Sequence, residues 1–450
     1  MKIIRVITVF IFTFILLLPV VFFNFDEDAV SVIDNRMLAP NPFVESDENF
    51  QTRLSNYISD RNKFREIMIR TYNVWNDRLF NVMTQPGFVY GKDGQVFGHG
   101  ITTGNDYGRL QDAFAEMVVK INDYCDERDI PFLFVVEPAK PAVYTDELPD
   151  GINYDRQWVD MLMDNLRLNG VPVLDNAVTM RRLREEGIEP YNRMFDPNHW
   201  NAMGAFYGSA EILSRLFEQY PGIHINDLSE FTLSYRHMDT LTGSANFPID
   251  EDVPVLTPVL RGVHTITDEY EGLQIDPHYN KFEYYINPTR LEEGGPRVMV
   301  FQGSYFNGVD DVYFQNAFGE YICIHNYMNV VNFPYYFNIF QPDCVVFEVA
   351  EYAVNRSYFN RSDMHNAQYN PPLGSVPADD LVHVNPETDD IAFEQSGALT
   401  TVTWSTDEVY DHVWAVVEGT EYDMIPTDGG YYFAYTGGPA YDIGIVYEDS

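Results

Sequence analysis

The chain has 450 residues, of which 68 are acidic and 28 are Lys or Arg, giving a formal net charge of −40. A surface this acidic repels phosphate backbones, so it excludes nucleic acid as a general partner and suits an extracellular setting. Hydrophobic residues make up 45% of the chain, enough for a large core and more than one domain. Cys125, Cys323 and Cys344 lie in apolar contexts without metal-ligand spacing, and we expect buried free thiols.

The first predicted element is an apolar run over residues 3–23, long enough to cross a hydrocarbon core of about 30 Å. Lys2 and Arg5 lie at its start and acidic residues follow it, so the positive-inside rule places the bulk of the chain outside the cell. Bulky residues at its end favour an uncleaved signal anchor over a cleavable signal peptide. We therefore expect a single-pass transmembrane anchor in residues 1–25 and an extracytoplasmic body.

Residues 26–85 are predicted to form a membrane-proximal helical stalk. Apolar residues recur there at helical spacing between Phe64 and Leu79. We expect this apolar face to pack on the domain that follows. The turn sequence at 91–94, between two short apolar runs, predicts a hairpin.

Apolar runs alternate with amphipathic helical segments over residues 86–370, which we treat as one domain. The predicted strands lie near residues 132–136, 171–174, 297–301, 321–324 and 344–347. The predicted helices lie near residues 110–125, 158–168, 201–216 and 310–318, and residues 220–296 are less regular and richer in turns. This α/β rhythm indicates a mainly parallel sheet with helices on both faces.

The residue composition and the spacing of turn residues change at about Pro371. Short β-rich runs punctuated by Pro, Asp and Gly predict a small all-β accessory domain over residues 371–450. Aromatic residues such as Trp404 and Trp414 are expected in its core, with stacking on sugar rings as the alternative.

Three residues could carry nucleophilic catalysis. Asp196 and His199 lie on one tight turn, close enough for the carboxylate to orient the imidazole. Ser304 follows a predicted strand, a place where α/β enzymes display a nucleophile. Each has an ordinary alternative, because Asp is a common helix cap, His a common surface residue and Ser a common turn residue. If the three converge, the chemistry is acyl transfer or ester cleavage.

An oxyanion would need hydrogen-bond donors beside Ser304. Gly303 allows a close backbone approach, and the amide of Ser304 itself could donate to the developing charge. Asn307 could add a side-chain donor, with an ordinary turn role as the alternative. No residue pattern indicates a metal or a cofactor.

The order of these blocks resembles the SGNH hydrolase-like domain of the AlgX and AlgJ polysaccharide O-acetylation proteins and their relatives in the DHHW family. The blocks that carry the resemblance are residues 34–40, 62–66, 89–94, 137–144, 199–205, 303–305 and 342–351. The resemblance implies an SGNH-like, flavodoxin-like α/β fold. It also implies a circularly permuted order, because the serine follows the Asp/His pair in the chain.

By resemblance, Ser304 would be the nucleophile, His199 the general base and Asp196 its orienting acid. Tyr305 and Lys140 match family positions near the pocket and are candidates for oxyanion or substrate binding, with their roles open. A surface lysine is the alternative for Lys140.

The sequence departs from the family at two places. The acid usually lies two residues before the histidine, whereas Asp196 lies three before His199, the spacing of ordinary SGNH esterases. The family's Gly-Asp-Ser is replaced by Gln302-Gly303-Ser304. Glu351 matches a family acid, and we expect a structural salt bridge there.

The resemblance implies an extracytoplasmic, membrane-anchored O-acetyltransferase that modifies a cell-surface or secreted polysaccharide through an acetyl-serine. Its partners would be the polysaccharide acceptor and a multi-pass membrane acyltransferase that supplies acetyl groups. A carbohydrate acetylesterase with the same triad and a catalytically inactive polysaccharide-binding scaffold remain alternatives.

Overall fold

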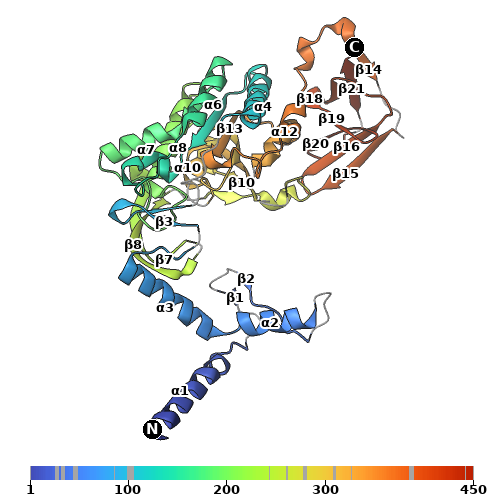
Figure 1. The fold of residues 1–450 in the computed structure, drawn as a ribbon. Coiled ribbons are helices and arrows are strands. Elements are labelled where there is room, and N and C mark those ends of the chain that lie inside the picture. Colours follow the sequence, from blue (N-terminus) through green and yellow to red (C-terminus); the bar gives the residue numbers. More distant parts are fainter. Residues whose placement is uncertain are drawn as a thin grey trace.

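The structure is a computed structural model that describes residues 2–25, 30–31, 36–43, 49–85, 87–98, 106–242, 244–259, 262–276, 281–307, 311–325, 327–384, 390–440 and 442–448. Figure 1 shows three regions along the chain: helices at the amino end, a central α/β body, and β-sheets at the carboxyl end.

The centre of the molecule is a mainly parallel sheet. Its strands are β5 (Phe132–Glu137), β6 (Val173–Asp175), β9 (His264–Thr265), β10 (Phe282–Ile286), β11 (Arg297–Gln302), β12 (Glu320–His325) and β13 (Cys344–Ala350). Over the described residues their order is β6-β5-β13-β11-β12-β10-β9. The first five run parallel, and β10 and β9 join antiparallel at one edge. Every residue of β5 and β13 is buried, as expected for strands covered on both faces. The predicted fold class is confirmed.

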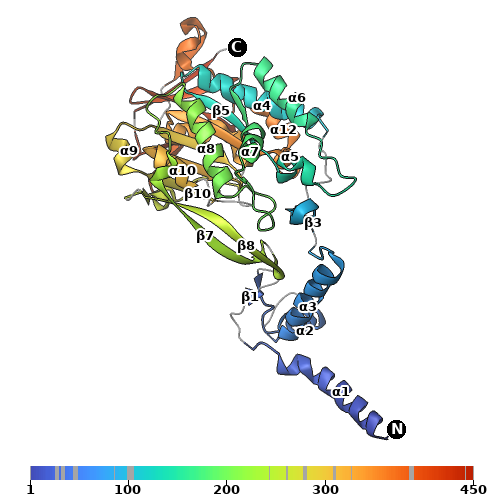
Figure 2. The ribbon, with the colours of Figure 1, turned by 90° about the vertical axis from the view of Figure 1, so that its left-hand side faces the viewer.

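Helices cover the sheet in two groups. They are α4 (Arg109–Asp126), α5 (Lys140–Val143), α6 (Gln157–Leu168), α7 (Asn176–Glu185), α8 (Ala202–Phe217), α9 (Pro288–Glu292), α10 (Asp311–Ala317), α11 (Phe333–Phe340) and α12 (Arg361–Asn366). α4 packs with α6 and α12, whereas α8 packs with α7 and α10 (Figures 1 and 2). The predicted helices correspond to α4, α6, α8 and α10. The apolar stripe of α4, including Phe114, Met117 and Ile121, is fully buried.

Residues 220–296 contain a long ribbon that the sequence did not indicate. β7 (Phe231–Leu241) pairs antiparallel with β8 (Ser244–Pro258). Most of β7 is exposed, so its side chains show no apolar alternation. The ribbon extends from the α/β body toward the amino-terminal helices (Figure 2). The predicted hairpin next to it is confirmed by β3 (Val89–Tyr90) and β4 (Val96–Phe97).

The amino-terminal region consists of helices and a short strand pair. Its elements are α1 (Lys2–Val21), β1 (Val30–Ser31), β2 (Arg36–Met37), α2 (Phe50–Asp60) and α3 (Lys63–Phe80). Among the residues that the structure describes, no helix has both the length and the hydropathy needed to cross a membrane. The predicted anchor in residues 1–25 stays a prediction.

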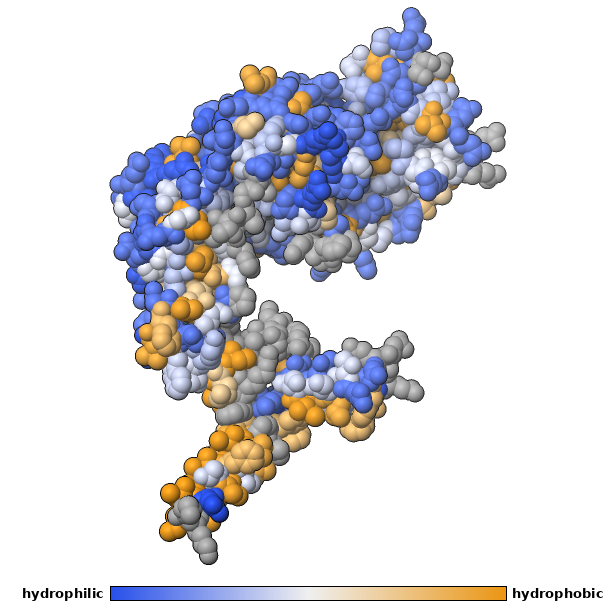
Figure 3. Space-filling view, in the orientation of Figure 1, coloured by the Kyte–Doolittle hydropathy of each residue, from blue (hydrophilic) through white to orange (hydrophobic). Residues whose placement is uncertain are grey.

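The apolar stripe of α3 does not cover the next domain, so that expectation is wrong. Tyr72, Trp75 and Leu79 are 61%, 63% and 69% exposed. The polar side of α3 makes the contacts instead: Asn73 is buried, and the Tyr90 hydroxyl donates to Asp77 Oδ1 at 2.6 Å. Figure 3 shows apolar surface on α1, α2 and α3.

The carboxyl-terminal region forms two antiparallel sheets. One has the order β14-β21-β17-β18, and the other β15-β16-β20-β19. Their bounds are β14 Leu381–Val384, β15 Ile391–Ser396, β16 Leu399–Ser405, β17 Val413–Val417, β18 Thr420–Asp423, β19 Ile425–Thr427, β20 Gly430–Thr436 and β21 Ile443–Glu448. Trp404, Tyr431 and Phe433 are buried in a core of their own. The predicted all-β character is confirmed, and the boundaries at 1–25, 26–85, 86–370 and 371–450 stay predictions.

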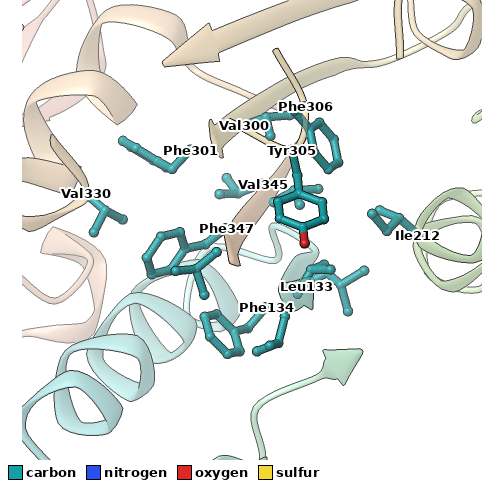
Figure 4. Close-up of a cluster of buried hydrophobic side chains, with 14 of the residues drawn as sticks. Leu133, Phe134, Ile212, Val300, Phe301, Tyr305, Phe306, Val330, Val345 and Phe347 are labelled. Carbon is teal, nitrogen blue, oxygen red and sulfur yellow. The ribbon is translucent and has the colours of Figure 1, made fainter. Parts of the chain in front are cut away.

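The main core lies around the central sheet. Leu133 and Phe134 of β5, Val300 and Phe301 of β11 and Phe347 of β13 all contribute to it (Figure 4). The thiols of Cys125, Cys323 and Cys344 are free and buried, as expected. Burial raises the pKa of all three thiols well above the usual range.

Candidate active site

The turn that carries Ser304 begins where β11 ends. Gly303 donates its backbone N–H to Glu348 Oε2 at 2.7 Å, which fastens the turn to the end of β13. Ser304 is exposed, whereas its neighbours Gly303 and Tyr305 are buried. The turn therefore presents one hydroxyl at the carboxyl edge of the sheet and hides the residues around it.

His199 lies on the turn that leads into α8. Asn201 caps this helix, with its Oδ1 accepting from Met203 N at 2.9 Å and Gly204 N at 3.1 Å. Trp200 is buried and fixes the start of the helix in the core. The anchored helix end holds the imidazole just before it.

Asp196 has a φ of 47°, in the left-handed region that Asp adopts more readily than most residues. Its Oδ1 accepts from the Asn198 amide at 3.3 Å, which closes the turn locally. The two residues between Asp196 and His199 thus form a tight turn, and the carboxylate and the ring face each other.

Asp196, His199 and Ser304 converge. His199 Nδ1 lies 2.9 Å from Asp196 Oδ1 and 3.0 Å from Oδ2. His199 Nε2 lies 2.9 Å from Ser304 Oγ. In the tautomer that the carboxylate favours, Nδ1 donates to Asp196 and Nε2 accepts from the Ser304 hydroxyl. This is the geometry of a nucleophile, a general base and an orienting acid.

Tyr305 is placed beneath the histidine and does not present a donor to the pocket. Its hydroxyl lies within hydrogen-bond distance of two backbone carbonyls, Pro138 O at 2.7 Å and Asn198 O at 2.8 Å. Its ring packs edge-on against His199 and Trp200, each at 5.2 Å between centroids. Figure 4 shows Tyr305 among the buried apolar side chains of the sheet. Its contacts support the imidazole instead of binding an oxyanion.

Asn307 has its side-chain amide engaged on both sides. Gln302 Nε2 donates to its Oδ1 at 3.2 Å, and its Nδ2 donates to His325 Nδ1 at 2.9 Å. Burial, with the nearby Lys281, lowers the pKa of His325 to about 4, so the ring is neutral and can accept this bond.

The backbone N–H of Ser304, by contrast, has no acceptor among the described residues, which leaves it able to donate to an oxyanion.

Lys140 is neither a surface residue nor a group that reaches Ser304. It is fully buried, and its Nζ donates to Val96 O at 2.8 Å, Asn192 O at 2.8 Å and Arg193 O at 2.9 Å. Three carbonyls match the three N–H bonds of an ammonium group. Lys140 thus binds the chain that leads to Asp196 from the side of the sheet.

Glu251 of β8 binds backbone N–H groups of the same segment. Its carboxylate accepts from Arg193 N at 2.6 Å, Met194 N at 2.9 Å and Phe195 N at 2.6 Å. Burial lowers the pKa of Lys140 to about 7, and the charge of Glu251 is the largest influence opposing that fall. We call Lys140, Glu251 and residues 192–195 the loop clamp.

Sequence reasoning missed Glu251 and Glu348. Glu348 is fully buried, and burial raises the pKa of its carboxyl to about 8, so the group is protonated at neutral pH. An acidic residue inside an apolar strand was the available signal. Tyr352 was also missed; burial raises its pKa and contact with the Ser304 side chain opposes the rise.

Glu351 forms the expected salt bridge. Arg156 Nε donates to Glu351 Oε2 at 2.7 Å, and its other nitrogens bind Asp175 at 2.9 and 3.0 Å. Within the described residues, no group of three or more His, Cys, Asp or Glu side chains is arranged to hold a metal ion.

The fold and the site together define an α/β protein in which an aspartate, a histidine and a serine lie in hydrogen-bond contact at the carboxyl edge of the sheet. Residues 89–247 match the family model described as "SGNH hydrolase-like domain, acetyltransferase AlgX". The resemblance predicted from the sequence is therefore confirmed over this segment, which contains Asp196 and His199 and ends before Ser304.

Solved structures match the chain at low sequence identity. The O-acetyltransferase domain of Pseudomonas putida AlgJ has 15% identity and a TM-score of 0.43, covering 63% of this chain and 100% of that one. A DHHW family protein of Eubacterium siraeum has 15% identity and a TM-score of 0.45, covering 64% and 98%. Pseudomonas aeruginosa AlgX has 11% identity and a TM-score of 0.34, covering 80% and 90%. No curated protein sequence matches the chain.

Proposed function

We propose that this protein is an O-acetyltransferase that transfers an acetyl group to a hydroxyl of a cell-surface or secreted polysaccharide through an acetyl-serine at Ser304. The observation that carries the proposal is the hydrogen-bonded series Asp196–His199–Ser304, with 2.9 Å between His199 Nε2 and Ser304 Oγ. The matched acetyltransferase segment supports the choice of acetyl transfer among serine acyl chemistries.

The first half-reaction forms the acetyl-serine. His199 Nε2 takes the proton of the Ser304 hydroxyl as Oγ attacks the carbonyl carbon of an acetyl donor. The carbonyl oxygen, now negatively charged, accepts a hydrogen bond from the backbone N–H of Ser304. Collapse of the tetrahedral intermediate breaks the bond to the donor, whose leaving atom takes the proton from His199.

The second half-reaction returns the serine. A sugar hydroxyl loses its proton to His199 Nε2 and attacks the acetyl carbon. Collapse releases Ser304 Oγ, which takes the proton back, and the product is a sugar acetate ester. Asp196 remains ionised and stabilises the imidazolium in both halves.

Hydrolysis is the second candidate, because Ser304 is exposed and water can reach the acetyl-serine. The two functions differ only in the acceptor of the second half-reaction. With 4-nitrophenyl acetate as donor, net acetylation of an added oligosaccharide supports transfer, whereas release of acetate alone supports an acetylesterase.

Replacing Ser304 by Ala tests both against an inactive scaffold. We expect turnover of 4-nitrophenyl acetate to fall by roughly a thousandfold or more, because the attacking atom is lost. Ser214→Ala, an exposed serine on α8, is the matched control. Equal turnover in wild type and Ser304→Ala would overturn the catalytic proposal.

The predicted location outside the cytoplasm and on the membrane is also a proposal. It rests on the apolar run of α1 and the flanking charges. When cells that express the full chain are fractionated, the protein should be found with the membranes and should resist alkaline extraction. A chain lacking residues 1–25 should be released, and retention of that shorter chain would contradict the anchor.

A further inference from the structure

A cavity of about 1000 Å³ lies beside the amino end of α4, and arginine residues line it. Arg109 comes from the first turn of α4, and Arg356 and Arg361 from the segment that follows β13. All three are exposed. Asp106 is the one acidic residue among the residues that line this cavity in the described chain.

The guanidinium groups of these three arginines have no carboxylate partner among the described residues. Acidic residues outnumber basic ones 68 to 28, yet none of these three guanidinium groups makes an ion pair or hydrogen bond with another residue that the structure describes. Arg156 and Arg297 are paired with carboxylates, whereas Arg182 and Arg236, like the three arginines of the cavity, have no such partner among the described residues. The cavity differs from those two positions in bringing three arginines to one place. Guanidinium groups offer several N–H donors in a planar array, which suits carboxylate and phosphate groups.

The end of α4 adds to the positive character of the cavity. Gly108 caps this 18-residue helix without a side-chain acceptor for its first amides. Such a helix end carries a partial positive charge and unpaired N–H groups. Figure 3 shows strongly hydrophilic surface around α12, whose first residue is Arg361.

The cavity lies at the same edge of the sheet as Ser304. α4 leads directly into β5, so its amino end is at the carboxyl edge of the strands. Residues 355–361 follow the carboxyl end of β13, next to β11, after which Ser304 comes. Gln111 Nε2 donates to Val354 O at 3.3 Å and ties the two sides together.

We propose that this arginine cavity binds an anionic group, a carboxylate or a phosphate ester, of the polysaccharide acceptor. It thereby holds the acceptor chain along the edge where Ser304 lies. The identity of the acceptor as a polysaccharide rests on the proposed function. A membrane headgroup fits less well, since α4 and α12 lie at the opposite end of the molecule from α1 (Figure 1).

The net charge of the chain does not prevent such binding. Charges beyond about 8 Å are largely screened at physiological ionic strength. The three arginines act at contact distance, where the more distant acidic surface has little effect. The negative surface instead slows the approach of polyanions elsewhere, which favours binding at this one place.

The test is an isothermal calorimetric titration of the full chain with hexagalacturonate as the probe. No acetyl donor is present. We compare wild type with Arg109→Gln/Arg356→Gln/Arg361→Gln. The matched control is Arg167→Gln/Arg182→Gln/Arg215→Gln, which makes the same charge change on α6, α7 and α8. We expect the cavity variant to bind about tenfold more weakly or worse, with a smaller dependence on salt, and the control to stay within about twofold.

Three results would overturn the proposal: equal loss in the control, equal affinity for neutral maltohexaose, or unchanged affinity in the cavity variant. Inorganic phosphate separates the sources of the anion. Weak competition by phosphate supports a polymer-binding site, whereas phosphate binding as tightly as the hexamer contradicts the polysaccharide assignment. Because no turnover is measured, this result is independent of whether Ser304 is catalytic.

Discussion

At the scale of single residues, the site depends on a carboxylate that fixes one nitrogen of one imidazole. Asp196 occupies a backbone conformation with a φ of 47°, and such strain persists where surrounding structure enforces it. Here the loop clamp before Asp196 and the capped helix after His199 provide that enforcement. The surrounding structure therefore fixes the geometry of Asp196 and His199, and the chemical role of the carboxylate can be tested without disturbing the fold.

Asp196→Asn should keep the shape of the side chain and remove its charge. We expect kcat for 4-nitrophenyl acetate to fall by about a hundredfold to ten-thousandfold, because the amide no longer stabilises the imidazolium or selects the productive tautomer. Asp160→Asn, an exposed residue of α6, is the control. Activity of Asp196→Asn within about threefold of wild type would remove Asp196 from the mechanism.

Glu348 gives a prediction about stability and pH. Its carboxyl has a pKa near 8 in the folded chain against an ordinary value of 4.5, because it is fully buried. Between these values the folded chain holds a proton that the unfolded chain has lost, so this group's contribution to stability falls as the pH rises through that window. Glu348→Gln cannot titrate and still offers an oxygen to the Gly303 amide.

We therefore expect Glu348→Gln to be more stable than wild type at pH 8.5 by about 2 kcal/mol, with a smaller difference at pH 5. Urea unfolding curves followed by tryptophan fluorescence at both pH values measure this. A variant less stable than wild type at pH 8.5 would show that the carboxylate form is the one the fold requires.

The sequence was sufficient to predict the three residues that converge, because their types and their positions at turns carry the signal. It could not predict the roles of Lys140, Tyr305 and Asn307. Those depend on which carbonyls and rings the fold brings near, such as Val96 O and Arg193 O around Lys140. Glu251 lies far from Asp196 in sequence, and only the pairing of β7 with β8 brings it to the loop.

At the scale of elements, the ribbon of β7 and β8 acts on the site through Glu251. One carboxylate accepts three consecutive amides of residues 193–195, at 2.6 to 2.9 Å. Lys140 binds two carbonyls of the same segment, Asn192 O and Arg193 O. Charge-assisted bonds of this kind are short and directional, so the ribbon positions Asp196 without touching the reacting atoms.

Glu251→Gln should loosen this arrangement, because an amide has one acceptor oxygen in place of two. We expect kcat to fall by about tenfold with little change in KM, since positioning of the base is affected and substrate contacts are not. Asp252→Asn, the next residue of β8 and exposed, is the control. Equal kcat values in the two variants would mean that the ribbon has no positioning role.

The elements that the sequence missed share a physical reason. β8 contains Pro248, Pro254 and Pro258, residues that usually argue against a strand, and β7 is exposed on both faces. All eight residues of α11 are buried, so it has no polar face and no helical period. The long parallel strands and amphipathic helices were predictable because one side of each faces a different environment.

At the scale of the whole molecule, the carboxyl-terminal sheets are joined to the α/β body by polar contacts. Asn338 of α11 exchanges two hydrogen bonds with the backbone of Asp423, at 2.8 and 3.1 Å. Arg128, just after α4, lies over the Tyr124 ring and within 3.6 Å of Asp423 Oδ1. Burial raises the pKa of Asp423 to about 7, and Arg128 opposes the rise.

Arg128→Met should weaken this junction in a pH-dependent way. Without Arg128 the pKa of Asp423 rises further, and above that pKa folding must bury a carboxylate without its cationic partner, which costs about 3 kcal/mol. The pKa of Asp423 is higher in the folded chain than in the unfolded chain, so the unfolded chain loses this proton first as the pH rises. The loss of stability in Arg128→Met therefore grows as the pH increases from 5 to 8. Urea unfolding at both pH values measures the difference, with Arg128→Lys retaining most of the wild-type stability. If Arg128→Met lost the same amount at pH 5 as at pH 8, the packing of the guanidinium on Tyr124, and not its charge beside Asp423, would be what joins the two cores.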